Sequence, residues 1–177
     1  LSVRRAVDQA VLPVLAATRH GVRTPAVVAA ASVNGDASLL AFEHIDGLRS
    51  FKDLSADELT DDLLADLWEQ VRMLHRAGIA HEELHAGNLA VAPDGRSWLL
   101  GLDSGEVAAD QLTLRLDDAE LLVTTAQIIG ADRAVRGALL ELTAQRLGEA
   151  LPLLQVIALS RTNRRSLKQH RGLMAEL

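Results

Sequence analysis

The sequence predicts an α+β fold that is mainly helical in its second half. Three observations indicate this fold: apolar residues recur at helical spacing in several stretches, two pairs of short β-type runs each flank a turn, and helices and strands do not alternate regularly. A chain of 177 residues is long enough for one hydrophobic core and short for two. We therefore expect one domain, or one domain divided into two unequal lobes.

Apolar stripes predict where the helices lie. The clearest stripe begins at Leu59 and ends before Gly78, and Ser55 and Glu58 form a predicted capping box ahead of it. Pro13 should limit or kink the first helix of the chain. The other helices are expected over residues 4–20, from Asp117 to Gly130, over 132–147 and, as a buried helix, over 151–160.

Two hairpins supply the predicted strands. The first joins Val27–Val33 to Ser38–Phe42 through Asn34-Gly35, a dipeptide that favours a tight hairpin turn. The second joins Leu89–Val91 to Trp98–Leu100 through a Pro-Asp-Gly turn.

Composition excludes several classes of protein. The formal net charge is −6, and a negative chain without clustered Lys and Arg is a poor nucleic-acid binder. The absence of cysteine excludes disulfides, thiol catalysis and Cys-ligated zinc. No apolar run approaches the about 18 residues of a membrane span, and no signal peptide is visible. We expect a cytoplasmic protein.

The C-terminal segment reverses the sign of the charge. Residues 161–177 contain five basic residues and one acidic residue, which leaves a net charge of +4. Such a segment can bind an anionic membrane surface, which would place the protein at the inner face of the plasma membrane. It can equally be a solvated C-terminal helix whose charges oppose the helix dipole. The basic residues are Arg161, Arg164, Arg165, Lys168 and Arg171.

The residues that could carry chemistry follow the long helix, and two interpretations compete for them. His81-Glu82-x-x-His85 fits the H-E-x-x-H pattern, in which two imidazoles on one helix bind zinc, with Asp103 or Glu106 as a third ligand. Glycines three residues before and two residues after this segment would confine such a helix to barely two turns. Zinc is therefore the weaker interpretation.

The second interpretation is phosphoryl transfer. A helix, a His-x-acid-Leu-x-x-x-Asn loop, a hairpin and Asp-x-Gly follow one another as in a kinase catalytic loop and its metal-binding aspartate. One carboxylate must accept the substrate hydroxyl proton, while an Asn and a second carboxylate hold Mg²⁺ on the phosphates. Glu83, Asn88 and Asp103 occupy these catalytic positions in order, with Asn88 and Asp103 as the metal ligands. The hairpin should bring Asn88 and Asp103 side by side.

These motifs resemble a known family. The loop His81–Asn88, read H-E-E-L-H-A-G-N, resembles the H-x-D-L-H-x-G-N loop of aminoglycoside phosphotransferases and related bacterial kinase-like proteins. The stretch Leu39–Gly47 is similar to the last N-lobe strand and hinge of that family. The resemblance implies ATP and Mg²⁺ as cofactors, with adenine contacting backbone groups near Glu43 and Ile45.

The resemblance covers nearly the whole chain and implies a protein-kinase-like fold. An incomplete N-lobe sheet and hinge would span residues 1–49, and a mainly helical C-lobe would span 50–177. Asp117 matches the acid that braces the catalytic loop. The stretch from Leu116 to Leu177 looks more specifically like the cytoplasmic kinase-like region of actinobacterial lysylphosphatidylglycerol synthase-like (flippase-like) membrane proteins, which implies a membrane-protein partner.

Two departures from the family pattern affect the catalytic loop. Glu83 replaces the proton-accepting Asp, and a misplacement of about 1 Å by the extra methylene can lower the rate about 10²-fold. The metal-binding Asp of the family follows the loop Asn by roughly thirteen residues, as in other kinase-like loops. Asp103 follows Asn88 by 15 residues, and an ungapped count puts Gly101 at that position. The sequence does not decide between Gly101 and Asp103.

Two further departures affect the nucleotide site. Ala10 stands where the N-lobe helix should present a Glu, and the two lysines, Lys52 and Lys168, are not placed to meet phosphates. Losing several parts together removes most of the positioning on which phosphoryl transfer depends. We therefore expect a pseudokinase module that binds or regulates a bacterial envelope membrane protein, with ATP and Mg²⁺ binding weak or lost. The alternatives are an active ATP/Mg²⁺ phosphotransferase on a small molecule or protein, and a zinc hydrolase.

Overall fold

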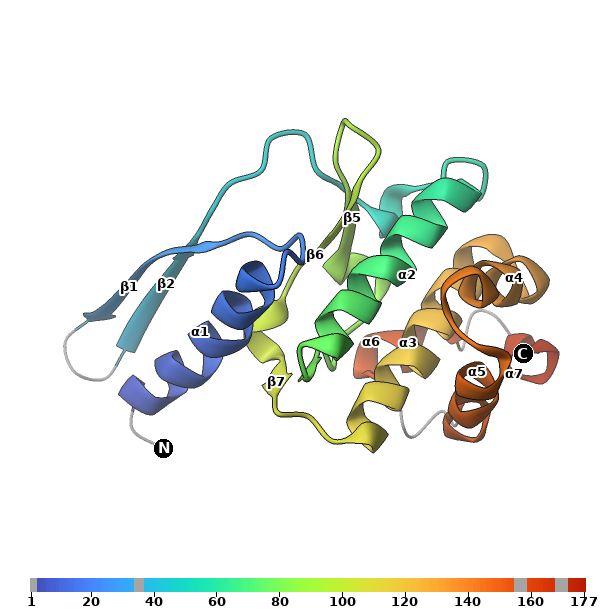
Figure 1. The fold of residues 1–177 in the computed structure, drawn as a ribbon. Coiled ribbons are helices and arrows are strands. Elements are labelled where there is room, and N and C mark those ends of the chain that lie inside the picture. Colours follow the sequence, from blue (N-terminus) through green and yellow to red (C-terminus); the bar gives the residue numbers. More distant parts are fainter. Residues whose placement is uncertain (1–2, 34–36, 155–158, 168–171) are drawn as a thin grey trace.

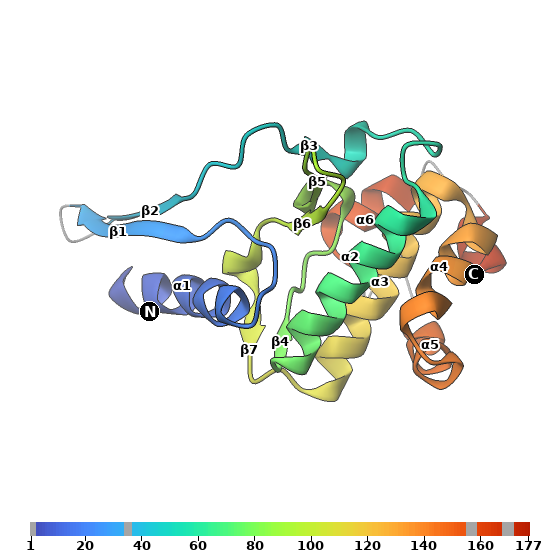
Figure 2. The same ribbon diagram turned by 45° about the horizontal axis from the view of Figure 1, so that its top comes forward.

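The computed structural model describes residues 3–33, 37–154, 159–167 and 172–177 (Figure 1). The chain opens with helix α1 (Val3–Arg19), which lies alongside an extended hairpin of β1 (Val27–Val33) and β2 (Ala37–Phe42) in both views (Figures 1 and 2). The remaining helices gather at the other end of the molecule. They are α2 (Asp61–Arg76), α3 (Gln111–Ile129), α4 (Ala131–Glu141), α5 (Ala144–Ala150), α6 (Arg161–Leu167) and α7 (Leu173–Glu176).

The strands of the described ranges form three small antiparallel sheets, of which the β1–β2 hairpin is one. The order of helix, hairpin, long helix, short hairpin and helices confirms the predicted α+β organisation. The short strands are β3 (Arg49–Ser50), β4 (Ile79–Ala80), β5 (Leu89–Val91), β6 (Ser97–Leu99) and β7 (Glu106–Val107). The short 3-10 helices are η1 (Phe51–Asp53), η2 (Ala86–Asn88), η3 (Leu102–Ser104) and η4 (Leu151–Leu153).

Both predicted hairpins are present. β1 pairs with β2 up to Val33 opposite Ala37, and the turn between them lies outside the described residues. β5 pairs with β6, with Leu89 opposite Leu99, and Gly95 makes their turn at a φ of 81°. The pairings of β3 with β5 and of β4 with β7 are additional, since strands of two residues carry no sequence periodicity.

Local capping explains why α2 starts later than predicted. Thr60 is the N-cap, and its hydroxyl accepts a hydrogen bond from the backbone N–H of Leu63 at 3.2 Å. Ser55 and Glu58 do contact each other, because the backbone N–H of Ser55 donates to Oε2 of Glu58 at 2.9 Å. That contact closes a separate turn ahead of the helix, so the predicted capping box was wrong as a helix start.

Two other predicted helices have different bounds. α3 begins at Gln111, six residues before Asp117, because Asp110 caps it by accepting from the backbone N–H of Thr113 at 2.8 Å. The predicted helix over 132–147 is broken into α4 and α5, since the hydroxyl of Thr143 caps a new helix.

The predicted buried helix over 151–160 was wrong where the structure describes it. Residues 151–153 form the short η4, and the side chain of Leu151 is 40% exposed. Residues 155–158 lie outside the described residues. Pro13 lies inside α1, which continues past it to Arg19.

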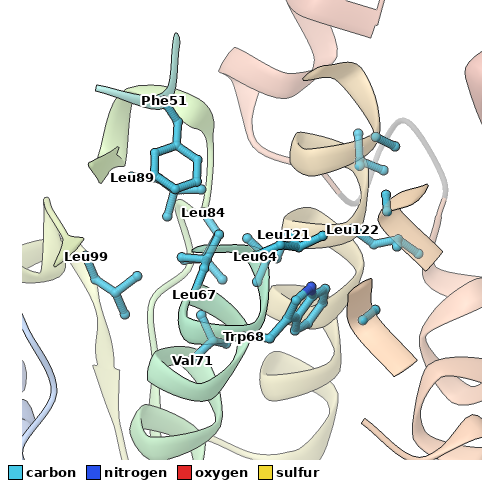
Figure 3. Packing of buried hydrophobic residues seen from close by; sticks show 14 of the residues in the cluster. Phe51, Leu64, Leu67, Trp68, Val71, Leu84, Leu89, Leu99, Leu121 and Leu122 are labelled. Carbon is cyan, nitrogen blue, oxygen red and sulfur yellow. The ribbon is translucent and has the colours of Figure 1, made fainter. Parts of the chain in front are cut away.

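The hydrophobic core lies between α2, α3 and the chain segments that connect the short strands (Figure 3). Trp68 of α2 is fully buried in this core, as expected of a core residue. α4 approaches α2 closely, because Gly137 faces Leu64 with no room for a side chain. The labelled neighbours in Figure 3 are Phe51, Leu64, Leu67, Val71, Leu84, Leu89, Leu99, Leu121 and Leu122. Among the described helices, none has both the length and the apolar character needed to cross a bilayer.

Candidate active-site loop and cleft

The segment from His81 to His85 is an irregular loop between β4 and η2. Glu82 has a φ of 65°, which no helix tolerates. The H-E-x-x-H interpretation needs both imidazoles on one helical face, and the structure contains no helix there. Among the described residues, no group of three or more His, Asp or Glu side chains could hold a metal ion.

Asp117 of α3 holds the start of this loop. Its buried carboxylate accepts hydrogen bonds from the backbone N–H groups of His81 at 2.6 Å and of Glu82 at 2.8 Å. Asp117 therefore has the bracing position that the resemblance implies. Asp117 lies in the second turn of α3 rather than at the helix start, and from there its carboxylate reaches the N–H groups of the loop.

A second acid on α3 holds the middle of the loop. Glu120 accepts from the backbone N–H of Leu84 at 3.1 Å, and the hydroxyl of Thr124 donates to the carbonyl of Leu84 at 2.7 Å. Ser160 and Asn163 donate to the other oxygen of Glu120, while burial raises the pKa of its carboxyl. The sequence reasoning missed these residues.

A sequence signal for them exists. Asp117, Glu120 and Thr124 follow one another at spacings of three and four, which places three polar groups on one face of a helix whose buried residues are mostly apolar. A buried polar face of this kind indicates partners on a neighbouring segment, because buried polar groups are nearly always hydrogen-bonded.

The histidines of the loop are structural. Burial lowers the pKa of His81, which is completely buried, even though the charge of Asp117 opposes this effect. Burial also lowers the pKa of His85. Nδ1 of His85 accepts from the backbone N–H of Gly87 at 3.1 Å and so caps η2.

Asn88 lies at the end of the loop and faces Gly101. The side-chain amide of Asn88 donates to the backbone carbonyl of Glu83 at 3.1 Å, and the backbone carbonyl of Asn88 accepts from the backbone N–H of Leu100 at 2.7 Å. A Cβ placed on Gly101 would lie 2.8 Å from Nδ2 of Asn88. The residue next to the Asn88 side chain is thus a glycine, with a φ of 73°.

Asp103 lies two residues further along, on η3. Its side chain is exposed and lines the cleft described below, whereas Asn88 does not line that cleft. Glu83 is also exposed, and its carbonyl holds Asn88. The structure therefore brings Glu83 and Asn88 together through this hydrogen bond, and it places Asp103 on the wall of a cleft that Asn88 does not line.

The cleft has two compartments that share Asp103. The larger, about 520 Å³, lies between α1 and the loop segments, with Ala10 on one wall and Glu82, Asp103 and Glu106 on the other. Burial, together with the charges of Glu106, Asp117 and Glu83, raises the pKa of Glu82. This compartment is therefore acidic, and its opposite wall on α1 is mostly apolar.

The smaller compartment, about 230 Å³, lies between α1, the base of the hairpin and η3. Glu43 lines it together with Phe42 and Gly101, and the backbone N–H of Glu43 donates to the carbonyl of Ala26 at 2.7 Å. Ile45 is half-buried in the connection that follows β2 and does not line this compartment. Of the two predicted hinge residues, only Glu43 borders the cleft.

A further polar cluster ties α2 to the segment between α1 and β1 and to β6, and the sequence reasoning missed it. Asp66 of α2 accepts from Arg23 at 2.5 Å and from the backbone N–H and hydroxyl of Ser97 at 2.7 and 2.6 Å. Partial burial alone would raise the pKa of Asp66, but the hydrogen bonds from Ser97 and Arg23 hold it below its ordinary value. No sequence signal distinguishes Asp66 from the acids around it.

A comparison with known protein families identifies the family to which this fold and loop belong. The model of the lipopolysaccharide kinase (Kdo/WaaP) family matches residues 11–120, more than half of the chain, including both hairpins, the loop and most of the residues that line the cleft. A search of curated proteins found no match. The match confirms the predicted kinase-like fold, and nothing found supports the narrower likeness to lysylphosphatidylglycerol synthase-like proteins. The chain therefore belongs to the lipopolysaccharide kinase (Kdo/WaaP) family.

Proposed function

We propose that this chain is a pseudokinase module, which keeps the kinase-like loop and cleft for binding or regulation rather than for phosphoryl transfer. The observation that carries the proposal is the contact between Asn88 and Gly101. In a kinase loop the Asn and a second carboxylate hold Mg²⁺ on the phosphates. Here a glycine, which has no side chain to bind a metal, lies against the Asn.

The residues present do not fit Mg²⁺, which the family implies as a cofactor together with ATP. The side-chain amide of Asn88 already donates to the carbonyl of Glu83. Mg²⁺ requires near-octahedral oxygen ligands at about 2.0–2.1 Å, and among the described residues no group of three or more His, Asp or Glu side chains could supply such a set. Glu83 in place of the proton-accepting Asp would displace a second part of the machinery, because its carboxylate is one methylene further from the backbone.

The charge of the cleft also disfavours a nucleotide triphosphate. Glu43, Glu82, Asp103 and Glu106 line the two compartments, and neither Lys nor Arg is among the described residues that line them. A triphosphate in this cleft would face like charges with no cation to offset them. Weak or absent ATP binding follows from this arrangement.

An active ATP- and Mg²⁺-dependent phosphotransferase is the second candidate. One observation favours it: Asp103 lines both compartments, so its carboxylate is the group that could serve a metal in this cleft. In that case Asp103, rather than Gly101, would be the family's metal-binding position. The two candidates therefore differ in what the carboxylate of Asp103 does.

We further propose that the module regulates an envelope membrane protein at the inner face of the plasma membrane. The support is the sequence likeness of the stretch from Leu116 to Leu177, which lies almost wholly beyond the family match at residues 11–120, and the basic residues of 161–177. Two of those residues, Arg161 and Arg165, are exposed on α6. Lys168 and Arg171 lie outside the described residues.

The experiment that tests the proposal is a calorimetric titration with ATP, with and without Mg²⁺, combined with an assay for ATP turnover. We expect no Mg²⁺-dependent binding and no turnover. The variants are Asp103→Asn and, as a charge-matched control away from the cleft, Asp132→Asn. Mg²⁺-dependent turnover that Asp103→Asn abolishes and Asp132→Asn preserves would establish the second candidate instead.

A further inference from the structure

A buried hydrogen-bonded chain connects the loop to the surface of α5. Asp117, which accepts the two loop N–H groups, also lies 3.1 Å from Nε2 of His75 on α2. The other ring nitrogen of His75, Nδ1, lies 2.7 Å from Nη2 of Arg146 on α5. The side chains of His75 and Asp117 are 2% and 1% exposed, whereas that of Arg146 is 34% exposed.

The chemistry of these groups fixes where the ring proton lies. A guanidinium is only a donor, so Nδ1 of His75 must be the unprotonated nitrogen if Arg146 donates to it. A carboxylate is only an acceptor, so Nε2 must carry the proton that meets Asp117. Every hydrogen bond in the chain then points the same way, from Arg146 to His75 and from His75 to Asp117.

A separate observation agrees with this assignment. Asp118 lies beside the same ring, with Oδ1 3.5 Å from Nδ1 of His75, and this oxygen is buried with no hydrogen-bond partner among the described residues. A proton on Nδ1 would have given Oδ1 a donor. The other oxygen of Asp118 accepts from Nε of Arg146 at 2.8 Å, so one guanidinium serves both Asp118 and His75.

We propose that Arg146 is a positioning residue that selects the Nε2–H tautomer of His75 and thereby orients Asp117 toward the backbone of the active-site loop. His75 donates to the same oxygen of Asp117 that accepts from His81. Without Arg146, Nδ1 faces Oδ1 of Asp118 with no competing donor, so the tautomer with its proton on Nδ1 gains an acceptor and should be favoured. The inference concerns the loop geometry and holds whether or not the cleft transfers phosphate.

The direct test needs no variant. In protein with ¹⁵N-labelled histidine, long-range ¹H–¹⁵N spectra at neutral pH distinguish the two neutral tautomers and the imidazolium. His75→Gln identifies the signals of His75 among those of the six histidines. We expect the pattern of a neutral ring protonated at Nε2. A ring protonated at Nδ1, alone or together with Nε2, would overturn the proposal.

Variants then test the role of Arg146. Arg146→Met should change the tautomer or protonation of His75, and Arg146→Lys, which keeps a charged donor, should restore at least part of the wild-type pattern. The matched control is Arg115→Met, because Arg115 and Arg146 line the same surface pocket between α3 and α5, and Arg115 pairs with Glu149 at 2.9 Å rather than with His75. An unchanged His75 pattern in folded Arg146→Met would contradict the proposal.

Hydrogen exchange supplies a readout at the loop. In Arg146→Met the amides of His81 and Glu82 should exchange about tenfold faster than in wild type, with the core amide of Leu122 as the reference. A tenfold change corresponds to the loss of about one net hydrogen bond. Arg115→Met should leave this ratio within about twofold of wild type. Equal acceleration of all three amides in Arg146→Met would mean that Arg146 stabilises the fold without positioning the loop.

Discussion

Gly101 packs against the side chain of Asn88 so closely that a Cβ on the glycine would lie 2.8 Å from Nδ2 and 3.0 Å from Cγ and Oδ1. This contact shows that Gly101, which follows the β5–β6 hairpin, is the residue that packs against the side chain of Asn88. The proposed loss of a metal site depends on it.

The first prediction is that Gly101→Ala destabilises the protein by about 2–3 kcal/mol, because the left-handed backbone and the contact with Asn88 both oppose a methyl group. Urea denaturation measures the change. Gly95→Ala is the control, since Gly95 has a similar φ of 81° but open space around it, and should lose only about 1 kcal/mol. An equal loss in both variants would show that the Asn88 contact is unimportant.

The second prediction concerns the approach of α4 to α2. Gly137→Ala should destabilise the fold by about 1–3 kcal/mol, because its Cβ would lie 2.0 Å from Cδ2 of Leu64. Gly148 is exposed on α5, and a Cβ placed on it would meet no neighbouring atom within 4 Å. Gly148→Ala should therefore stabilise the fold by about 0.5–1 kcal/mol. Thermal unfolding of both variants measures whether their stabilities change in opposite directions. A Gly137→Ala variant as stable as wild type would contradict the packing described.

The elements that the sequence predicted well are those with strong local signals. The β-type runs on either side of residues 34–36 and the turn at Gly95 predicted two hairpins that the structure contains, and the apolar stripe from Leu59 predicted α2. Helix ends were harder to predict, because several residues near each end can act as a cap. Thr60 and Asp110 do so in the structure, whereas Ser55 and Asp117 were the candidates on sequence grounds.

The site was only partly predictable, because it depends on register and on contacts distant in sequence. Counting residues could not choose between Gly101 and Asp103, whereas the pairing of Leu89 with Leu99 and the bond from Leu100 to Asn88 bring Gly101 to the loop. His75 stands alone in the sequence, and its partners come from α3 and α5. The roles of Glu83, Asn88, Asp103, Glu43 and Ile45 stay predictions until they are tested.

The third prediction is a pH dependence that comes from Asp66. Hydrogen bonds from Ser97 and Arg23 outweigh the effect of partial burial and place the folded-state pKa of Asp66 below its ordinary value of 3.8. The stabilisation is therefore complete above about pH 4 and is lost as the pH falls through the lower folded-state value. Asp66→Asn should lose about 1–3 kcal/mol at pH 7 and much less near pH 2.

Urea denaturation at a series of pH values measures this difference. Asp57→Asn, an exposed change just ahead of α2, is the control and should follow wild type at every pH. A constant gap between Asp66→Asn and wild type from pH 7 to pH 2 would contradict the assignment.

The fourth prediction tests the proposed membrane contact. The protein should sediment with vesicles that contain anionic lipid at low salt and be released as salt screens the charges. Arg161→Gln with Arg165→Gln should weaken this binding about tenfold or more, at about 1 kcal/mol for each charge. Arg96→Gln, an exposed basic residue on the second hairpin, should have little effect. Equal binding to neutral vesicles would remove the electrostatic basis of the proposal.

The central claim is that no metal site exists beside Asn88, and paramagnetic relaxation by Mn²⁺ with ATP measures this most directly. We predict no selective broadening of the amide signals of Asn88 and Gly101 at Mn²⁺ concentrations that saturate ordinary kinase sites. Strong broadening centred on Asn88, lost in Asp103→Asn and kept in Asp132→Asn, would contradict the claim and show a working metal site.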